Sequence, residues 1–560
     1  MKRGLLMTVS MMVSLGCGGG GGAPPPPVTT STDAALYAQA VQDYNGKAYT
    51  TAKGEFGELL ARPSATAYHD KATVYIAAID FYQGNPATCL SVLGSPTAPT
   101  SGFFATYPGS AEMDRARYWH GRCELGLTPP AYLTARGDFT AVITMPPGTY
   151  TDNAYLWRGR TYYATALATG DEASLDWASA LSDFQAVISS FGTGTVAPEA
   201  KYWLGRTHFA RGDTAKARGT QVGDQFAKAE YVLAASELGQ HLTTYPGNFW
   251  APDVSVYLAR THLEQASFAI DKVTAYGAAA GEFVPVLGTT AAVRDEANYW
   301  YGRTLYELGL AHETATVPDF PAAQAQLLLA ETQLRKFQSD ATLSTSKLAD
   351  NASYWVGRCL FSQADLKKTR AVLAADFAGA QVAFAAAEAS LAATKGSSQF
   401  ATSNVLDLVQ IYLGRSQFEQ GVCAAAQGLV ATALYSTAQL SFGDYFIHYG
   451  TPALPSAAAF RYRRGRTYYA QASLAPAITD FDTVVASWDF VGIVGPARPT
   501  TVWWDNSQYY LVRSHSDQVA CPAAQVAYDA LKAAIPADSL LPAACTYMKG
   551  ASRCPGNTCP

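Results

Sequence analysis

The chain has 560 residues, of which 49% are hydrophobic and only 15% are charged. Forty lysines and arginines stand against 45 acidic residues, which gives a formal net charge of −5. The hydrophobic share excludes disorder along the whole chain. The acidic balance excludes the class of proteins that bind nucleic acid through a basic surface and displace the counterions of the phosphates.

The first residues have the form of an export signal. Lys2 and Arg3 precede an uncharged, small or apolar stretch over residues 4–16, which is too short to span a bilayer permanently. This stretch ends in Ser14-Leu15-Gly16 and is followed by Cys17. The pattern predicts a secretory signal, and an ordinary signal to which Cys17 is incidental is the weaker of two interpretations.

The end of the signal also resembles the lipobox of bacterial lipoproteins, in which a cysteine after a small residue receives the lipid. The resemblance implies that residues 1–17 are a lipoprotein signal with Cys17 as the lipidation site. Gly18 follows the cysteine, which implies sorting to the outer membrane. Residues 18–32 begin with a glycine run and continue with a proline run. Since glycine runs are flexible and proline runs are extended, we expect a tether.

One motif recurs nine times in the body of the chain, between residues 33 and 535. It consists of aromatic residues, a glycine and an arginine, as in Tyr202-Trp203-Leu204-Gly205-Arg206, and two weaker copies lack the glycine. The arginines are Arg122, Arg160, Arg206, Arg260, Arg303, Arg358, Arg415, Arg466 and Arg513. Successive arginines lie between 38 residues (122 to 160) and 57 residues (358 to 415) apart. This is the signature of a repeat protein.

A second pattern of small and aromatic residues follows each motif, for example Ala477, Phe481 and Val484. Spacings of four and three place these side chains on one face of a helix. Each repeat is therefore predicted to be two helices, A with the arginine and B with the second pattern. The glycine lets a neighbouring helix approach closely, and the tryptophan is predicted to pack between repeats. Acidic residues seven or eight positions before the arginine are interpreted as caps of helix A.

The paired helices, with small residues near Gly205 and Ala217 and a chain break at Tyr245-Pro246, resemble the tetratricopeptide repeat. The tryptophan-glycine core and long loops look most like repeats of Gram-negative envelope proteins, such as the Tol-Pal coordinator and outer-membrane assembly lipoproteins. Two degenerate units precede the first arginine, over about residues 33–89. The resemblance implies an all-α fold, an α-solenoid of about eleven helix pairs over residues 33–535.

The repeated arginines have two interpretations. Residues four before and three after an arginine lie on its face of helix A, and in the tetratricopeptide family this face lines the concave groove where ligands bind. The resemblance thus implies a partner-binding groove made by the nine arginines with Tyr118, Tyr202, Tyr299, Tyr354 and Tyr462. The alternative is an internal ladder, in which each arginine stacks on aromatic rings and pairs with the next repeat.

Eight cysteines remain besides Cys17, and an exported chain meets an oxidising compartment, so up to four disulfides are possible. At the C-terminus, Cys554 and Cys559 flank a turn-rich loop that could close on itself, with Cys521 and Cys545 before it. Residues 536–560 are predicted to be a Cys-rich cap of the array. A zinc knuckle is the weaker alternative, because no matching pair or histidine stands nearby.

The sequence contains no catalytic signature such as a P-loop, a zincin helix or a nucleophile elbow. We therefore expect a protein that is not an enzyme and uses no cofactor or metal. The leading hypothesis is a lipid-anchored scaffold of the cell envelope that binds envelope proteins through its concave repeat surface and touches the membrane only through its lipid. The alternative is a carbohydrate- or peptidoglycan-binding outer-membrane lipoprotein, with which 33 tyrosines and 10 tryptophans are compatible.

Overall fold

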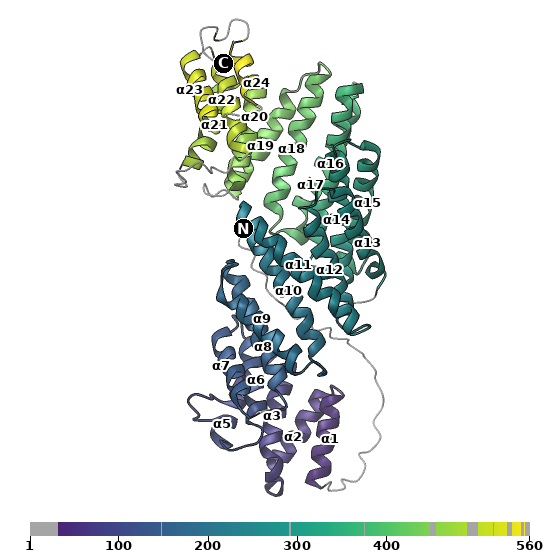
Figure 1. Cartoon of the computed structure of the whole chain (residues 1–560), viewed down its shortest axis with the longest axis vertical. Helices are drawn as coiled ribbons and strands as arrows, with labels where there is room; N and C mark the ends of the chain where they lie inside the picture. Colours follow the sequence, from purple (N-terminus) through teal and green to yellow (C-terminus); the bar gives the residue numbers. More distant parts are fainter. Residues whose placement is uncertain are drawn as a thin grey trace. The chain divides into compact units, whose positions relative to one another are not determined.

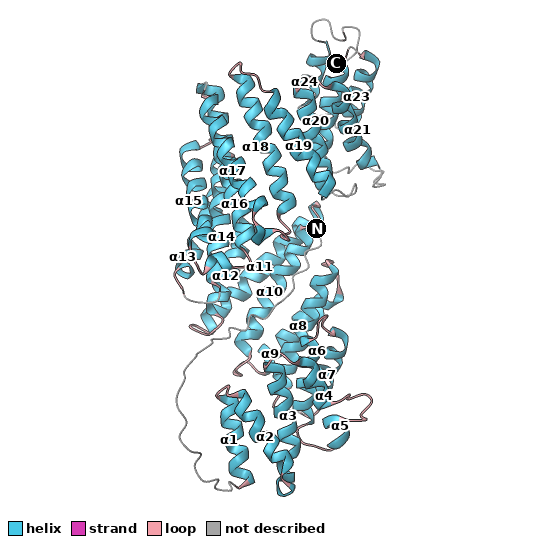
Figure 2. Ribbon diagram, turned by 180° about the vertical axis from the view of Figure 1, so that it is seen from behind, coloured by secondary structure: helices cyan, strands magenta, loops and turns pink. Residues whose placement is uncertain are grey.

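The structure is a computed structural model that describes residues 32–146, 148–289, 293–374, 376–448, 455–489, 502–518, 520–534, 540–549 and 554. Cys17, the signal and nearly all of the tether lie outside these residues. The described residues form helices joined by short loops, and no strand occurs among them (Figures 1 and 2). No helix in this part of the chain has the length and apolar character needed to cross a membrane.

The chain divides into two compact units, Met1–Phe268 (unit 1) and Ala269–Pro560 (unit 2). The helices of unit 1 are α1 (Asp33–Asn45), α2 (Tyr49–Ala61), α3 (Thr66–Tyr82), α4 (Pro86–Leu93), α5 (Gly102–Thr106), α6 (Met113–Gly126), α7 (Tyr132–Thr144), α8 (Thr151–Thr169), α9 (Leu175–Ser190), α10 (Ala197–Lys216), α11 (Gln221–Thr244) and α12 (Ala251–Ala266). Each A helix from α6 to α10 packs against the B helix that follows it.

Unit 2 continues the alternation of A and B helices. Its helices are α13 (Lys272–Leu287), α14 (Arg294–Glu313), α15 (Phe320–Ser339), α16 (Ala349–Ala374), α17 (Phe377–Gly396), α18 (Leu406–Ala426), α19 (Thr432–His448), α20 (Pro455–Ala470), α21 (Leu474–Asp489), α22 (Val502–Asp517), α23 (Cys521–Ala534) and α24 (Leu540–Lys549). Among the described residues, A and B helices thus alternate along the chain within each unit, which confirms the predicted all-α repeat solenoid.

The second repeat pattern lies on the B helices as predicted. Ala180, Phe184 and Val187 of α9 are fully buried, and so are Ala477, Phe481 and Val484 of α21. The two degenerate N-terminal units are the pairs α1/α2 and α3/α4. The core of each unit is therefore the seam between A and B helices, filled by side chains at the spacing that the sequence shows.

The cysteines differ from two expectations. Cys89 is bonded to Cys123, and Cys554 is bonded to Cys521, so the proposed closure of Cys554 on Cys559 is wrong. The backbone N–H of the buried Cys554 donates to the carbonyl of Met548 in α24, and its disulfide partner Cys521 is the first residue of α23. Cys359 and Cys423 are free and buried, so the upper limit of four disulfides is not reached.

Candidate functional site

The glycine of the motif marks the point where helix A touches helix B. A Cβ on Gly159 would stand 2.8 Å from the ring of Phe184, and one on Gly357 would stand 2.5 Å from Cδ2 of Leu391. Both neighbours are fully buried. The motif glycine is therefore fixed by close packing, which agrees with its predicted role.

A second link between A and B helices escaped the sequence analysis. The residue before the glycine is basic in three repeats, and it binds an aspartate directly before the core aromatic of helix B. Arg158 donates to Asp183 at 2.9 and 2.7 Å, and Arg464 donates to Asp480 at 2.8 and 2.7 Å. Burial is the main cause that raises the pKa of Asp183. The signal was present in the sequence as a basic residue and an aspartate at matching repeat positions.

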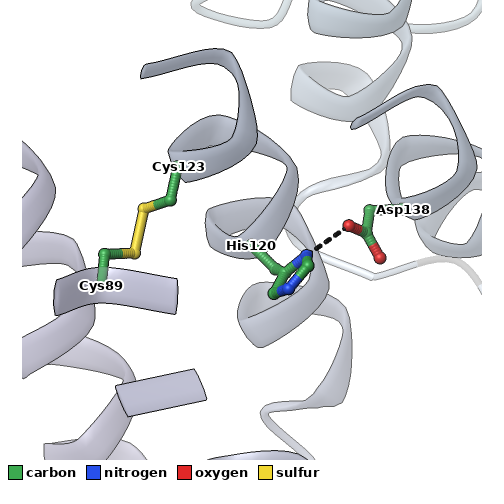
Figure 3. The surroundings of a disulfide bond; sticks show 4 residues. All are labelled: Cys89, His120, Cys123 and Asp138. Carbon is green, nitrogen blue, oxygen red and sulfur yellow. Dashed lines mark hydrogen bonds and ion pairs between the residues drawn. A yellow bond between two sulfur atoms is a disulfide. The ribbon is translucent and has the colours of Figure 1, made fainter. Parts of the chain in front are cut away.

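The corresponding pair in α6 and α7 is His120 with Asp138, whose Nδ1 and Oδ2 lie 2.5 Å apart. Figure 3 shows the imidazole pointing to the carboxylate, with the Cys89–Cys123 disulfide on the same stretch of α6. His120 and Asp138 are 5% and 3% exposed. This histidine is thus a packing residue between two helices, with no open space around it for a substrate.

The nine arginines stack between aromatic rings of neighbouring repeats. Within a unit, the guanidinium of one repeat generally lies over the ring three residues after the arginine of the preceding repeat, and over the ring three residues before the arginine of the next. Arg358, for example, lies 5.1 Å from the Tyr306 ring and 4.3 Å from the Tyr412 ring. Arg206 repeats this arrangement with Tyr163 and Tyr257, at 5.9 and 4.6 Å. Arg160 departs from this rule because the preceding repeat has Leu125 at the first of these positions, and it lies over Trp157 and Trp203 instead.

We call these two columns the arginine ladders. The ladder of unit 1 holds Arg122, Arg160, Arg206 and Arg260, and that of unit 2 holds Arg303, Arg358, Arg415, Arg466 and Arg513. All nine side chains are half-buried. The contacts are those that the ladder interpretation requires, and the partner-binding groove remains a prediction for the face that the ladders leave accessible.

The five predicted tyrosines lie beneath the ladders. Tyr118, Tyr202, Tyr299, Tyr354 and Tyr462 are 2–5% exposed. Their hydroxyls serve the arginines, since Arg122 donates to Tyr118 at 2.8 Å and Arg358 donates to Tyr354 at 3.1 Å. Burial raises the pKa of Tyr354 to about 12. The hydroxyl of Tyr354 is thus a neutral hydrogen-bonding group at physiological pH.

One rung of the unit 2 ladder departs from the rule. Where the next repeat should present a ring to Arg415, α20 has Arg463. Burial, and next the charge of Arg415, lower the pKa of Arg463 to about 9. Arg466 stands one turn further along α20 and lies 4.8 Å from the Phe418 ring. Arg415, Arg463 and Arg466, which we call the cationic rung, therefore gather three guanidinium groups at one place.

Carboxylates neutralise the ladders unevenly. Arg160 in unit 1 forms an ion pair with Glu199 at 2.9 Å. Within the described part of unit 2, by contrast, Arg358, Arg415 and Arg466 have no ion-pair partner. Arg358 instead donates to the neutral hydroxyl of Tyr306 at 2.7 Å. Arg303 lies 3.9 Å from Glu307, so positive charge without an ion pair in the described residues remains on Arg358, Arg415 and Arg466.

The search against protein families found no matching model, and no curated protein matches the sequence. Similar solved structures include Naa15/Naa10 bound to HypK-THB (TM-score 0.24, covering 92% of this chain and 96% of that chain) and the APC/C hetero-tetramer Cut9-Hcn1 (TM-score 0.27, 92% and 96%). A circular tandem repeat protein has TM-score 0.24, with 91% and 96% covered. The identity is 10% in each case, so these similarities concern the fold alone.

Proposed function

We propose that this chain is a lipid-anchored scaffold of the cell envelope, and that it binds acidic segments of partner proteins on the A-helix face of unit 2. The observation that carries the proposal is the cationic rung. Guanidinium groups bind carboxylates through two parallel hydrogen bonds, and such charge-assisted bonds are among the strongest in proteins. A partner carboxylate at this rung would pair with Arg415 and Arg466, which have no ion-pair partner in the described part of unit 2.

The stacking of the ladder supports this role. Each guanidinium is already held by rings on both sides or by tyrosine hydroxyls, so it loses little freedom when a partner arrives. Arg415 shows this directly, because it lies 4.4 Å from the Phe361 ring and 4.6 Å from the Tyr412 ring. The stacked arginines thereby have two roles: they hold successive helix pairs together, and they present fixed positive charges along one face.

The binding role predicts the behaviour of methionine variants, since methionine keeps an apolar stem against the rings and removes the charge. We expect Arg415→Met/Arg466→Met to capture at least tenfold less of an acidic partner from envelope extract than the unaltered chain does. The control is Arg160→Met, whose charge Glu199 already offsets. Capture is measured by quantitative mass spectrometry, together with helicity and melting midpoint. Equal capture by both variants would contradict the proposed surface.

The anchoring role predicts the effect of removing the Cys17 thiol. Each methylene of an acyl chain contributes about 0.8 kcal/mol to membrane binding, and serine at this position offers no thiol to acylate. We expect Cys17→Ser to move the protein from the membrane pellet to the soluble fraction, and to abolish labelling by a palmitate analogue. Membrane association that survives this change would show that Cys17 is not the anchor.

A further inference from the structure

A pocket in unit 2 is lined by residues of α17, α18, α19 and α20. Its volume is about 620 Å³, which is within the usual range for small-molecule sites. Its polar lining includes Lys395, Gln410, Ser441, Asp444, Arg464 and Tyr468. Neither the repeat pattern nor the proposed scaffold role accounts for this pocket.

Gln410 lines the pocket and has a buried hydrogen-bond acceptor without a donor in the described part of the chain. Its side chain is 1% exposed, and its Nε2 donates to the carbonyl of Ser441 at 2.6 Å. Its Oε1 is buried and has no donor among the described residues. The matching residue of α14, Asn298, receives a hydrogen bond from Gln333 at 2.5 Å. Because a buried acceptor without a donor costs about 1–3 kcal/mol, Gln410 calls for a donor from outside the chain.

The charged groups at the pocket are already neutralised. Lys395 lies 2.6 Å from Asp444. Arg464 donates two hydrogen bonds to Asp480, from Nε at 2.8 Å and from Nη2 at 2.7 Å. Because Lys395, Asp444 and Arg464 are each in an ion pair, the lining favours neither a phosphate nor an amine as ligand. It does offer amide, hydroxyl and carboxylate groups that can each exchange hydrogen bonds with a neutral polar ligand.

Rings and apolar groups complete the lining. Phe446 and Tyr468 are half-buried, whereas Leu440 and Ile447 are 71% and 80% exposed. Gly443 stands between them on α19, and a Cβ there would meet nothing within 4 Å. The pocket therefore combines a flat apolar surface with hydrogen-bonding groups that carry no net charge. A sugar ring has this combination, with an apolar face of C–H groups and a rim of hydroxyls.

We propose that this pocket binds a neutral saccharide of one or two rings, with a ligand hydroxyl donating to Oε1 of Gln410. This inference goes beyond the scaffold role and does not rest on it. Among the described side chains that line the pocket, the one buried acceptor without a donor is this amide oxygen, and a single ligand hydroxyl satisfies it.

The test measures binding of N,N′-diacetylchitobiose and of cellobiose to the full chain by isothermal titration calorimetry. We expect saturable binding of at least one disaccharide, weakened at least tenfold by Gln410→Leu. The melting midpoint of this variant shows whether it folds. A second variant, Gly443→Leu, fills the open space and should abolish binding with no loss of stability.

Gly239→Leu is the matched control. Gly239 follows Leu238 on α11, and Gly443 follows Phe442 on α19. Leu238 and Phe442 each pack on the motif glycine of the preceding A helix, so the two glycines occupy equivalent positions. A Cβ on Gly239 also meets nothing within 4 Å, but no residue of α11 lines the pocket. Gly239→Leu should therefore leave saccharide binding unchanged.

Three results would overturn the inference. They are the absence of binding by either disaccharide, binding that Gly443→Leu leaves intact, and displacement of the sugar by an acidic peptide or by inorganic phosphate. Capture of an acidic partner through the cationic rung should be the same for Gln410→Leu and the unaltered chain. A failure of the saccharide test thus leaves the scaffold proposal standing, and a failure of partner capture leaves the saccharide proposal standing.

Discussion

Replacing both Cys89 and Cys123 by alanine is expected to lower the free energy of unfolding of unit 1 by about 3–4 kcal/mol. The disulfide joins α4 to α6 across 34 residues, and a loop of this length loses that much entropy in the unfolded chain according to the chain-entropy model. Both cysteines are fully buried in one core cluster. Urea unfolding followed by circular dichroism measures the change.

Dithiothreitol should have the same effect on the unaltered chain. The free thiol Cys359, which is also fully buried, supplies the control. Cys359→Ala removes a sulfur but no cross-link, so it should cost about 1 kcal/mol as a small cavity and leave the dithiothreitol effect unchanged. An unfolding transition that neither reduction nor the double replacement shifts would mean that this disulfide does not hold α4 to α6.

Replacing Gly205 by alanine is expected to destabilise unit 1 by about 1–3 kcal/mol, the usual cost of overpacking a core. A Cβ on Gly205 would stand 2.6 Å from Cγ of Leu238, which is fully buried and cannot move aside. The gain in helix propensity, at most about 1 kcal/mol, offsets this cost only in part.

Gly239→Ala in the facing helix is the matched control with the opposite sign. A Cβ on Gly239 meets no atom within 4 Å, so alanine should stabilise the unit by about 0.5–1 kcal/mol. The free energies of unfolding of both variants are compared in the same buffer. If the two changes had the same sign, the close contact of α10 with α11 at the motif glycine would be wrong.

Much of the fold could be predicted from the sequence because the same motif and the same spacing of buried residues recur from repeat to repeat. The spacing of Ala180, Phe184 and Val187 specified the buried face of α9, and the recurrence of the pattern gave the alternation of A and B helices. The packing roles of glycine and tryptophan are confirmed by the same argument. Trp203, for instance, is 3% exposed and lies 5.3 Å from the Tyr163 ring of the preceding repeat.

Other features depend on which repeat comes next in space. The aspartates at the start of the A helices were interpreted as caps, and Asp350 does accept a hydrogen bond from the N–H of Asn351 in the first turn of α16. Its second oxygen, however, accepts from Ser403 at 2.5 Å, at the entrance to α18. This link from repeat to repeat could not be read from one chain, because insertions of unequal length separate the two residues.

The candidate site was predicted only in part. The sequence showed that arginines and rings share a face, but not that guanidinium groups such as those of Arg206 and Arg358 are enclosed by rings from two neighbouring repeats. The sequence shows Arg463 at the motif position where other repeats have tryptophan or tyrosine. Only the contacts in the structure show that this position faces the arginine of the preceding repeat. The missing donor at Gln410 could not be predicted. In the matching repeat, the amide of Gln333 on α15 donates to Asn298, whereas α19 offers Gln410 only the backbone carbonyl of Ser441, which accepts.

The most direct test of the central claim is the salt dependence of partner binding. The affinity of a captured acidic partner for the full chain is measured from low to high ionic strength, with the unaltered protein and with Arg415→Met/Arg466→Met. The account predicts that the affinity of the unaltered chain falls steeply as salt screens the exposed charges, and that the variant binds weakly with little salt dependence. Equal affinities and equal salt dependence for both proteins would contradict it.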